Sequence, residues 1–344
     1  MTETLSDIGE FGLIDLIRGL LQKEQVHAPE VTLGIGDDAA SFRPGRGREL
    51  LVTCDCMVEG SHYLPEHMNP SDLGRRAMVM NISDIGAMGG RPRYATVSLG
   101  LRPETGLADI KAMYRGFISE LRPFKASIIG GNITKTEHSA FIDITLIGEV
   151  ETGKIVRRST ARPGDRILVT GYPGQAAAGL RLLREGKTHD NLINHPLIAA
   201  FIRPSHRAVE GQIVAQKGYA TSMIDISDGL LGDLGHICEQ SNVGADIFQD
   251  RLPSNGHMKE YSLSQDKPIY HMALRNSDDY ELIMTCLPEN MEAIKSELAS
   301  LADTPVTEIG RINDKPRDIS LIRPDNSRYK LFPTGWDHFI GEMD

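Results

Sequence analysis

The chain carries the stretch Gly34-Ile35-Gly36-Asp37-Asp38-Ala39-Ala40, in which two adjacent carboxylates follow two glycines. Glycine lets the backbone turn sharply, and neighbouring Asp side chains repel each other unless a cation lies between them. Carboxylate oxygens are the hard ligands that Mg²⁺ prefers. A single stretch of this kind also fits an Asx-rich surface turn, so a metal site is favoured only if the chain repeats the pattern.

Further acidic turns repeat it, at Cys54-Asp55, Ser83-Asp84 and Ile224-Asp225-Ile226-Ser227-Asp228-Gly229-Leu230. Asp55 closes an apolar segment that we expect to be a buried strand, where a carboxylate without a partner is costly. Asp84 lies among Met, Ile, Ala and Gly, with no Lys or Arg one helical turn away. Asp228 suits the cap of a following helix, but that role does not explain Asp225. Clustered acids of this kind predict Mg²⁺ sites, and such Mg²⁺ usually accompanies a nucleoside triphosphate.

The composition favours small-molecule ligands over nucleic acid. The 344 residues include 37 basic and 47 acidic side chains, for a formal net charge of -10, without a long run of Lys or Arg. No apolar stretch is long enough to span a bilayer, and residues 1–10 carry acids where a signal peptide carries bases. We therefore expect a cytoplasmic protein that binds neither nucleic acid nor membrane.

The pattern of strands and helices predicts an α/β (α+β) chain of two domains, which its length also favours. Turn-rich segments at 152–154 and 161–165 place the boundary near residue 150, giving domains 1–150 and 151–344. The first half predicts strands at 49–56, 94–101, 127–129 and 140–150 and helices at 71–88 and 104–122; the second predicts strands at 166–170, 245–248, 280–285 and 306–312 and helices at 175–184, 206–217 and 230–241.

The segment Gly130-Gly131-Asn132-Ile133-Thr134-Lys135-Thr136 follows a predicted strand and is expected to be a loop with main-chain N–H groups free for an anion. It is not a P-loop, because Thr134 stands before Lys135 where that motif requires Gly. Near the domain junction, Arg157, Arg158 and Arg162 suit phosphate oxygens, although surface arginines are ordinarily solvated.

Cys54 and Cys56 are two positions apart on a predicted strand, so their side chains should share one face. A metal site formed with His62 would lack a second pair of ligands. We expect both cysteines to be small buried residues instead.

Together these segments resemble the thiamine-monophosphate kinase family, within the superfamily of aminoimidazole ribonucleotide synthetase and selenophosphate synthetase. The resemblance covers nearly the whole chain, and the motifs follow one another in the same order and at the same spacing as in the family. It is carried by Gly9-Glu10-Phe11, the 34–40 stretch, Val58-Glu59-Gly60-Ser61-His62, Asn81-Ile82-Ser83-Asp84-Ile85-Gly86-Ala87-Met88-Gly89, Arg162-Pro163-Gly164-Asp165, the 224–230 stretch, Asp279-Tyr280-Glu281-Leu282 and Gly335-Trp336-Asp337-His338-Phe339.

The resemblance implies a homodimer in which the N-terminal halves contribute strands to a shared β-barrel flanked by helices, while a C-terminal α/β domain completes the site. It also implies binding of ATP with several Mg²⁺ ions and transfer of the γ-phosphoryl group to thiamine monophosphate. The acceptor phosphate is already anionic, so alignment and charge neutralisation should suffice and no dedicated catalytic base is expected.

The family's functional positions can be carried over to matching residues. The resemblance implies contacts to thiamine monophosphate at His62, Asp278 and Trp336, although Trp336 equally suits packing of the C-terminal segment. It implies Mg²⁺ ligands at Asp38, Thr53, Cys54, Asp55, Asp84, Asn132, Asp225 and Asp228, and nucleotide contacts at Gly131, Asn132, Arg158, Ser227 and Tyr114.

Three positions depart from the family pattern. Asn132 replaces the last residue of Gly-Gly-Asp, and Cys54 replaces a Thr, which leaves a poor Mg²⁺ ligand unless its main-chain carbonyl coordinates. Asn276-Ser277-Asp278 replaces Gly-Gly-Glu. These changes leave two alternatives open: a divergent paralogue acting on another small metabolite, or a catalytically weak nucleotide-binding regulator. The retained acidic clusters argue against the regulator, because a mere binder does not need so many of them.

Overall fold

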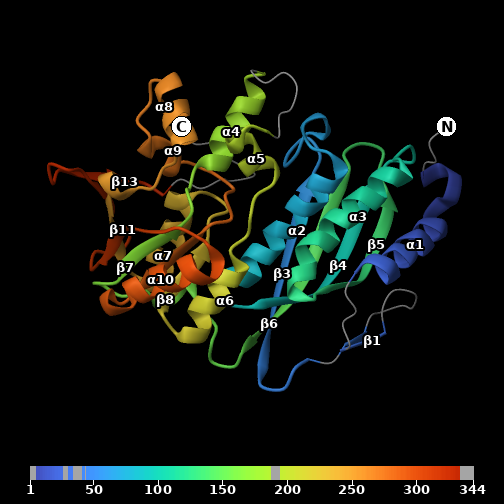
Figure 1. The fold of residues 1–344 in the computed structure, drawn as a ribbon, viewed down its shortest axis with the longest axis horizontal. Coiled ribbons are helices and arrows are strands. Elements are labelled where there is room, and N and C mark those ends of the chain that lie inside the picture. The colour runs from blue at the N-terminus through green and yellow to red at the C-terminus, as the bar shows by residue number, and fades with distance from the viewer. Residues whose placement is uncertain (1–4, 26–29, 34–40, 43, 187–193, 334–344) are drawn as a thin grey trace. The chain divides into compact units, whose positions relative to one another are not determined.

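Figure 1 shows the computed structural model, which describes residues 5–25, 30–33, 41–42, 44–186 and 194–333. Asp38 and Trp336 lie outside these described residues. The chain divides into two compact units, unit 1 with residues 1–85 and 90–153, and unit 2 with residues 86–89 and 154–344. The mixed α/β class and the presence of two domains are as predicted. None of the described helices is long and apolar enough to cross a membrane.

Unit 1 is built on an open four-stranded sheet with the order β3-β6-β4-β5. Strand β6 pairs antiparallel with β3 and β4, whereas β4 and β5 run parallel. A parallel pair needs a crossover, and the helix α3 between β4 and β5 supplies it. The strands are β3 (Arg48–Val58), β4 (Arg91–Leu101), β5 (Ser127–Lys135) and β6 (Phe141–Glu151), beside a small separate pair of β1 (Val31–Leu33) and β2 (Ser41–Phe42).

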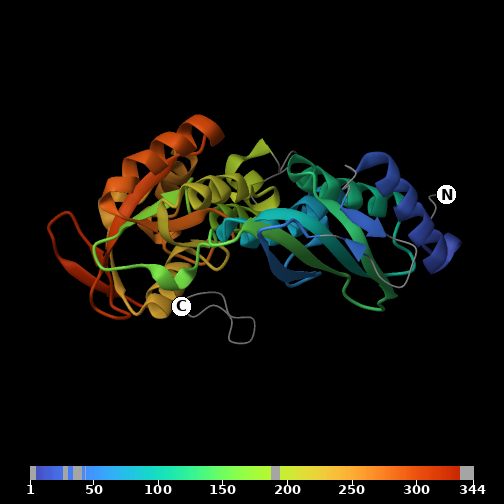
Figure 2. The same cartoon turned by 90° about the horizontal axis from the view of Figure 1, so that it is seen from below.

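Helices α1 (Leu5–Glu24), α2 (Pro70–Ala87) and α3 (Leu107–Leu121) lie on one face of this sheet (Figures 1 and 2). Side chains alternate along β3, so Leu51 and Met57 are buried while Leu50 and Val52 are 44% and 66% exposed. Cys54 and Cys56 share the exposed face, as predicted, but the expectation that they are buried was wrong. Within the described residues, the helices that would bury them cover the opposite face.

Strand β5 corrects the predicted anion-binding loop. The strand does not end at residue 129 but continues to Lys135, which pairs with Leu101 of β4. A Cβ atom at Gly131 would lie 2.0 Å from the carbonyl oxygen of Val97. Gly131 therefore lets two strands approach closely, and its lack of a side chain does not mark a loop.

Unit 2 contains a seven-stranded sheet with the order β13-β12-β9-β11-β7-β10-β8, antiparallel except for the β12–β9 pair. Its strands are β7 (Arg166–Thr170), β8 (Ala220–Asp225), β9 (Gly244–Phe248), β10 (Leu282–Cys286), β11 (Val306–Asn313), β12 (Ile319–Ile322) and β13 (Arg328–Leu331).

Helices cover both faces of this sheet. On β7, Ile167 packs in the cluster that contains Leu234 of α7, whereas Leu168 packs with Val214 of α6 and Leu298 of α10. Alternate residues of one strand thus serve two apolar cores. The helices of unit 2 are α4 (Gln175–Arg184), α5 (Pro196–Ile202), α6 (Ala208–Lys217), α7 (Leu230–Ser241), α8 (Gly256–Ser264), α9 (Tyr270–Ala273) and α10 (Met291–Ala302).

Candidate active site

In unit 1, β3 and α2 bring two of the predicted metal ligands together. The Thr53 hydroxyl donates a hydrogen bond to Asp84 Oδ2 over 2.5 Å, across 31 positions of sequence. Asp55 lies two residues beyond Thr53 and therefore on the same, helix-facing side of β3. All three side chains are half-buried. The result is a partly shielded set of oxygen atoms, which is the chemistry that Mg²⁺ selects.

Cys54 points to the other face of β3. Its Sγ donates a hydrogen bond to Asp143 Oδ1 at 3.3 Å and accepts one from the Thr145 hydroxyl at 3.5 Å. The thiol is therefore turned away from Thr53 and Asp55, and only the main chain of Cys54 belongs to their side of the strand.

Asn132 and Gly131 lie on β5, at the opposite edge of the sheet from β3. Asn132 is exposed and pairs in register with Ser98 of β4. Two strands separate β5 from β3, a distance of about 14 Å at the usual spacing of neighbouring strands. Unit 1 of a single chain thus does not bring Asn132 next to Thr53.

Two other predicted contacts of unit 1 occupy contrasting environments. Tyr114 is only 3% exposed, and its ring meets Phe117 edge to face at 5.2 Å between centroids. Burial raises the pKa of its hydroxyl. His62 is half-buried in the turn after β3, where its Nδ1 accepts a hydrogen bond from the main-chain N–H of Val58 at 3.0 Å. This bond fixes the orientation of the His62 ring relative to the end of β3.

In unit 2, the predicted Asp225, Ser227 and Asp228 surround the loop between β8 and α7. Asp225 ends β8 and is 1% exposed, whereas Ser227 is exposed and Asp228 half-buried. Gly229, with φ at +110°, closes the loop. A Cβ atom there would lie 2.4 Å from the carbonyl oxygen of Arg275, so only glycine fits.

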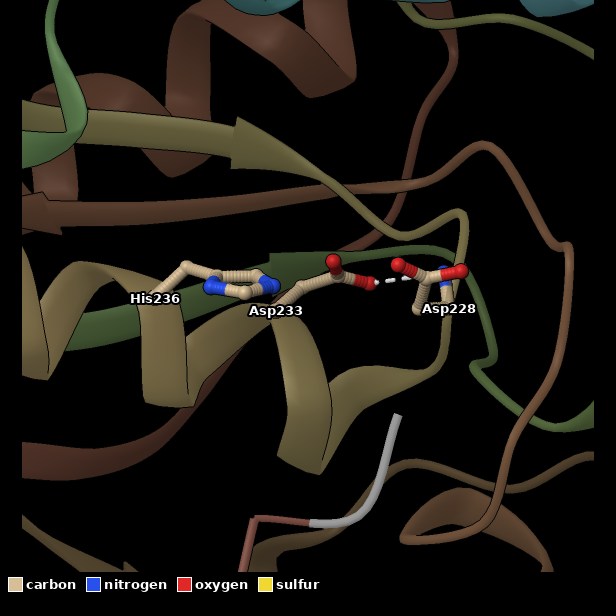
Figure 3. A group of neighbouring side chains, drawn as sticks. All are labelled: Asp228, Asp233 and His236. Atoms are coloured by element: carbon tan, nitrogen blue, oxygen red, sulfur yellow. Dashed lines mark hydrogen bonds between the residues drawn. The ribbon is translucent and has the colours of Figure 1, made fainter. Parts of the chain in front are cut away.

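Asp233, which sequence reasoning did not identify, organises this loop. Its Oδ2 accepts hydrogen bonds from the main-chain N–H groups of Ser227, Asp228 and Gly229, each at 3.1 Å, and the bond to Asp228 is drawn in Figure 3. Burial first, and then the charges of Asp225 and Asp228, raise the pKa of Asp233 to about 8. The available signal was an acid in the first turn of a helix that follows Ser-Asp-Gly.

His236 stands one turn further along α7, and Figure 3 shows its ring beside the Asp233 carboxylate. One ligand atom from each of Asp228, Asp233 and His236 lies within 4.8 Å of the other two. Three possible ligand groups are therefore gathered at this end of unit 2, where a bound cation would offset the charge of ionised carboxylates.

The predicted substrate contact Asp278 is half-buried between two residues that cap the start of α4. The Ser277 hydroxyl accepts a hydrogen bond from Ala177 N at 3.1 Å. The Asp279 carboxylate accepts from Gly174 N at 2.6 Å and from Ala176 N at 2.9 Å. Burial raises the pKa of Asp279 to about 7 against the effect of these bonds. Asp278 thus projects from a segment anchored on both sides.

Arg158 begins a short 3₁₀ turn, Arg158–Thr160. Its carbonyl oxygen accepts hydrogen bonds from the hydroxyls of Ser222 at 2.9 Å and Ser241 at 2.8 Å, while its side chain is exposed. The main chain of Arg158 is therefore fixed to β8 and α7, and its guanidinium group remains accessible.

A partly buried ion pair holds Glu281, the residue that precedes β10. Arg207 donates from Nε to Glu281 Oε2 at 2.6 Å and from Nη2 to Oε1 at 2.7 Å, and its Nη1 lies 3.4 Å from Glu210. The Thr170 hydroxyl also donates to Glu281 at 2.6 Å. Beyond the side chain, the carbonyl oxygen of Glu281 accepts from Ile226 N at 2.7 Å, which ties this network to the start of the loop.

Comparison with known proteins assigns both halves of the chain. Residues 36–150 match the family described as AIR synthase related protein, N-terminal domain, and residues 162–322 match its C-terminal domain. The thiamine-monophosphate kinase of Bacillus subtilis (strain 168) is 34% identical over 332 residues, which cover 94% of this chain and 98% of that protein.

Two solved structures share the fold over almost the full length. The crystal structure of thiamine-monophosphate kinase from Stenotrophomonas maltophilia K279a has a TM-score of 0.80 at 34% identity, covering 94% of this chain and 98% of that one. The structure described as AaThiL complexed with AMPPCP and TMP has a TM-score of 0.75 at 31% identity, covering 98% and 100%. The chain therefore belongs to the thiamine-monophosphate kinase family of enzymes.

Proposed function

We propose that this enzyme phosphorylates thiamine monophosphate with ATP, giving thiamine diphosphate and ADP by direct, Mg²⁺-assisted transfer of the γ-phosphoryl group. The observation that carries the proposal is the similarity, over 98% of the chain, to a structure in complex with AMPPCP and TMP. AMPPCP is an ATP analogue, so that complex holds a stand-in for the donor together with the acceptor.

We assign the metal ligands to the acidic clusters of both units. Thr53, Asp55 and Asp84 offer grouped oxygen atoms in unit 1, and Asp225 and Asp228 concentrate charge in unit 2. Bound Mg²⁺ would neutralise the repulsion between two polyanionic substrates, which is the main barrier to their alignment. The proposed set also includes Asp38, the main chain of Cys54, and Asn132.

The remaining assignments follow the family positions. We assign nucleotide binding to Gly131, Asn132, Arg158, Ser227 and Tyr114, and thiamine monophosphate binding to His62, Asp278 and Trp336. The accessible guanidinium of Arg158 suits phosphate oxygens, and the anchored segment around Asp278 suits a fixed substrate contact. In this proposal residues 1–150 bind ATP and Mg²⁺, residues 151–344 complete the site, and the enzyme works in the cytoplasm.

We further propose a homodimer in which two copies of the unit 1 sheet form a shared barrel. Two observations support it: the sheet of one chain is open, and its β3 face exposes Leu50 and Val52. Apolar side chains on an uncovered sheet face are typical of a surface that another copy buries.

The proposal is tested by incubating the purified enzyme with ATP, Mg²⁺ and thiamine monophosphate and measuring thiamine diphosphate and ADP together. Equal formation of both products supports the kinase. ADP without thiamine diphosphate would redirect the search to another small acceptor, and nucleotide binding without turnover would favour a regulator. Asp84→Asn should abolish transfer with the fold intact, whereas Glu239→Gln, which alters an exposed ion pair on α7, should not.

A further inference from the structure

We infer that Asp233 is a positioning residue: its buried carboxylate fixes the main chain of residues 227–229 so that Ser227 and Asp228 present their side chains to nucleotide and metal. The inference rests on the proposed function for the roles of Ser227 and Asp228. It goes beyond that function in assigning the loop's conformation to a residue outside the ligand set.

The loop directs three consecutive main-chain N–H groups at one atom. Ser227, Asp228 and Gly229 all donate to Asp233 Oδ2 at 3.1 Å, and Figure 3 draws the bond from Asp228. Successive main-chain N–H groups that converge in this way form a concave nest for an anion. Here the nest is filled by the Asp233 carboxyl group of the same unit, and that side chain is 2% exposed.

This arrangement has a consequence for ligand recognition. Because the three N–H groups point inward to Asp233, they are not free to hold a phosphate group, as the start of a helix often does. Ser227 is exposed and Asp228 half-buried, so their side chains are what the loop offers to ligands. Contacts from this loop should therefore be made by the Ser227 hydroxyl and the Asp228 carboxylate.

The loop is held from two directions, and the two anchors act on different residues. Ile226 exchanges main-chain hydrogen bonds with the neighbouring segment, donating to Glu281 at 2.7 Å and accepting from Tyr280 at 2.8 Å. Asp233 fixes the next three residues. Loss of the Asp233 carboxylate should thus release residues 227–229 while Ile226 and the sheet stay in place.

The experiment compares the full-length wild type with Asp233→Ala and Asp233→Asn, and with Glu239→Gln on the same helix as control. We expect Asp233→Ala to lower kcat about 30–100-fold, as misplacement of aligned groups does, and to raise the Mg²⁺ concentration needed for half-maximal rate. Asn keeps an acceptor oxygen without the charge, so Asp233→Asn should recover much of the rate, to within about 3–10-fold of wild type.

A double-mutant cycle with Asp228→Asn separates positioning from general stabilisation. If Asp233 acts through Asp228, the combined variant should be little worse than Asp228→Asn alone. If the fold-losses of kcat in the two single variants multiply fully in the double variant, the inference is overturned. It is also overturned by an Asp233→Ala protein that melts earlier but keeps the wild-type kcat and Mg²⁺ dependence well below its melting temperature. If Asp233→Ala does not fold, Asp233→Asn takes its place in the cycle, and either a wild-type rate or fully multiplicative losses of kcat with Asp228→Asn would overturn the inference.

Titration calorimetry with Mg²⁺ and AMPPCP distinguishes failure of this inference from failure of the proposed function, because it needs no acceptor. Weaker binding by Asp233→Ala would support the positioning role even if the wild type made no thiamine diphosphate. Unchanged binding and unchanged kcat, in a wild type that does make thiamine diphosphate, would reject the inference and leave the kinase assignment intact.

Discussion

Replacing Arg207 with Met should destabilise unit 2 by leaving two buried carboxylates without their cation. The side chains of Glu281 and Glu210 are each 6% exposed, and Arg207 contacts both. Two charge-assisted hydrogen bonds to Glu281, at 2.6 and 2.7 Å, are lost at about 1.5–3 kcal/mol each. Since breaking one partner of a buried pair typically costs about 3–5 kcal/mol, we expect a loss near 4 kcal/mol.

A thermal melt followed by circular dichroism measures this loss. For a unit of this size about 4 kcal/mol corresponds to a fall in Tm of about 8–16 °C. Arg317→Met is the matched control, because Arg317 pairs with Glu239 where the side chains are 73% and 56% exposed. An exposed pair of this kind contributes about 1 kcal/mol or less. A fall in Tm of less than about 3 °C for Arg207→Met would refute the reasoning.

Three further predictions address other parts of the chain. Asn132→Asp replaces an amide with a carboxylate, so it should lower the Mg²⁺ concentration that gives half-maximal rate and keep or raise the rate of thiamine diphosphate formation. A loss of activity would show that Asn132 serves another purpose. Gly211→Ala should cost about 1–3 kcal/mol or more in urea denaturation, because its Cβ would lie 2.1 Å from the carbonyl oxygen of Gly86, whereas Gly19→Ala, with open space around it in α1, should stabilise slightly. Burial raises the pKa of Asp246, but hydrogen bonds, of which the one from Arg328 has the largest effect, lower it below its ordinary value overall. This group therefore adds stability above about pH 4 that is lost as the pH falls through its folded pKa, so Asp246→Asn should destabilise the protein at pH 7 and progressively less as the pH falls below about 4.

Local signals were enough for several elements of the fold. The predicted bounds of β7 (166–170), α4 (175–184) and α7 (230–241) agree with the structure. In each case the segment is bounded by Gly, Pro or Asp in a turn and has an apolar pattern of one clear period. Not predicted were the helices α1, α5, α8, α9 and α10 and the strands β1, β2, β8, β12 and β13.

The errors arose where contacts distant in sequence decide the structure. Gly130 and Gly131 looked like a loop, but the close approach of Val97 on β4 is what requires glycine at position 131. The partner of Asp84 was sought one helical turn away, whereas Thr53 supplies it from a strand 31 positions earlier. Such pairings depend on the order of strands and helices in space, which spacing along the chain does not reveal.

The candidate site was predictable as a set of residue types but not as an arrangement. The acidic turns were recognisable because clustered Asp with Gly is a local pattern. Asp233 was not recognised, because an acid in the first turn of a helix ordinarily only complements the helix dipole. That it gathers three main-chain donors became evident from the structure alone.

The four cysteines differ in exposure, so their reactivity can report which surfaces of the protein are accessible. Cys238 and Cys286 are buried in unit 2, whereas Cys54 and Cys56 are exposed, two positions apart, on the face of β3 that the described helices leave uncovered. The hydrogen bond from Thr145 lowers the pKa of the Cys54 thiol, but partial burial and the neighbouring Asp143 outweigh it and raise the pKa overall. Partial burial and Asp143 also raise the pKa of the Cys56 thiol, so a thiol reagent should modify both slowly at neutral pH and faster under alkaline conditions. The number of thiols that react before unfolding therefore reports whether that face is open or covered in solution.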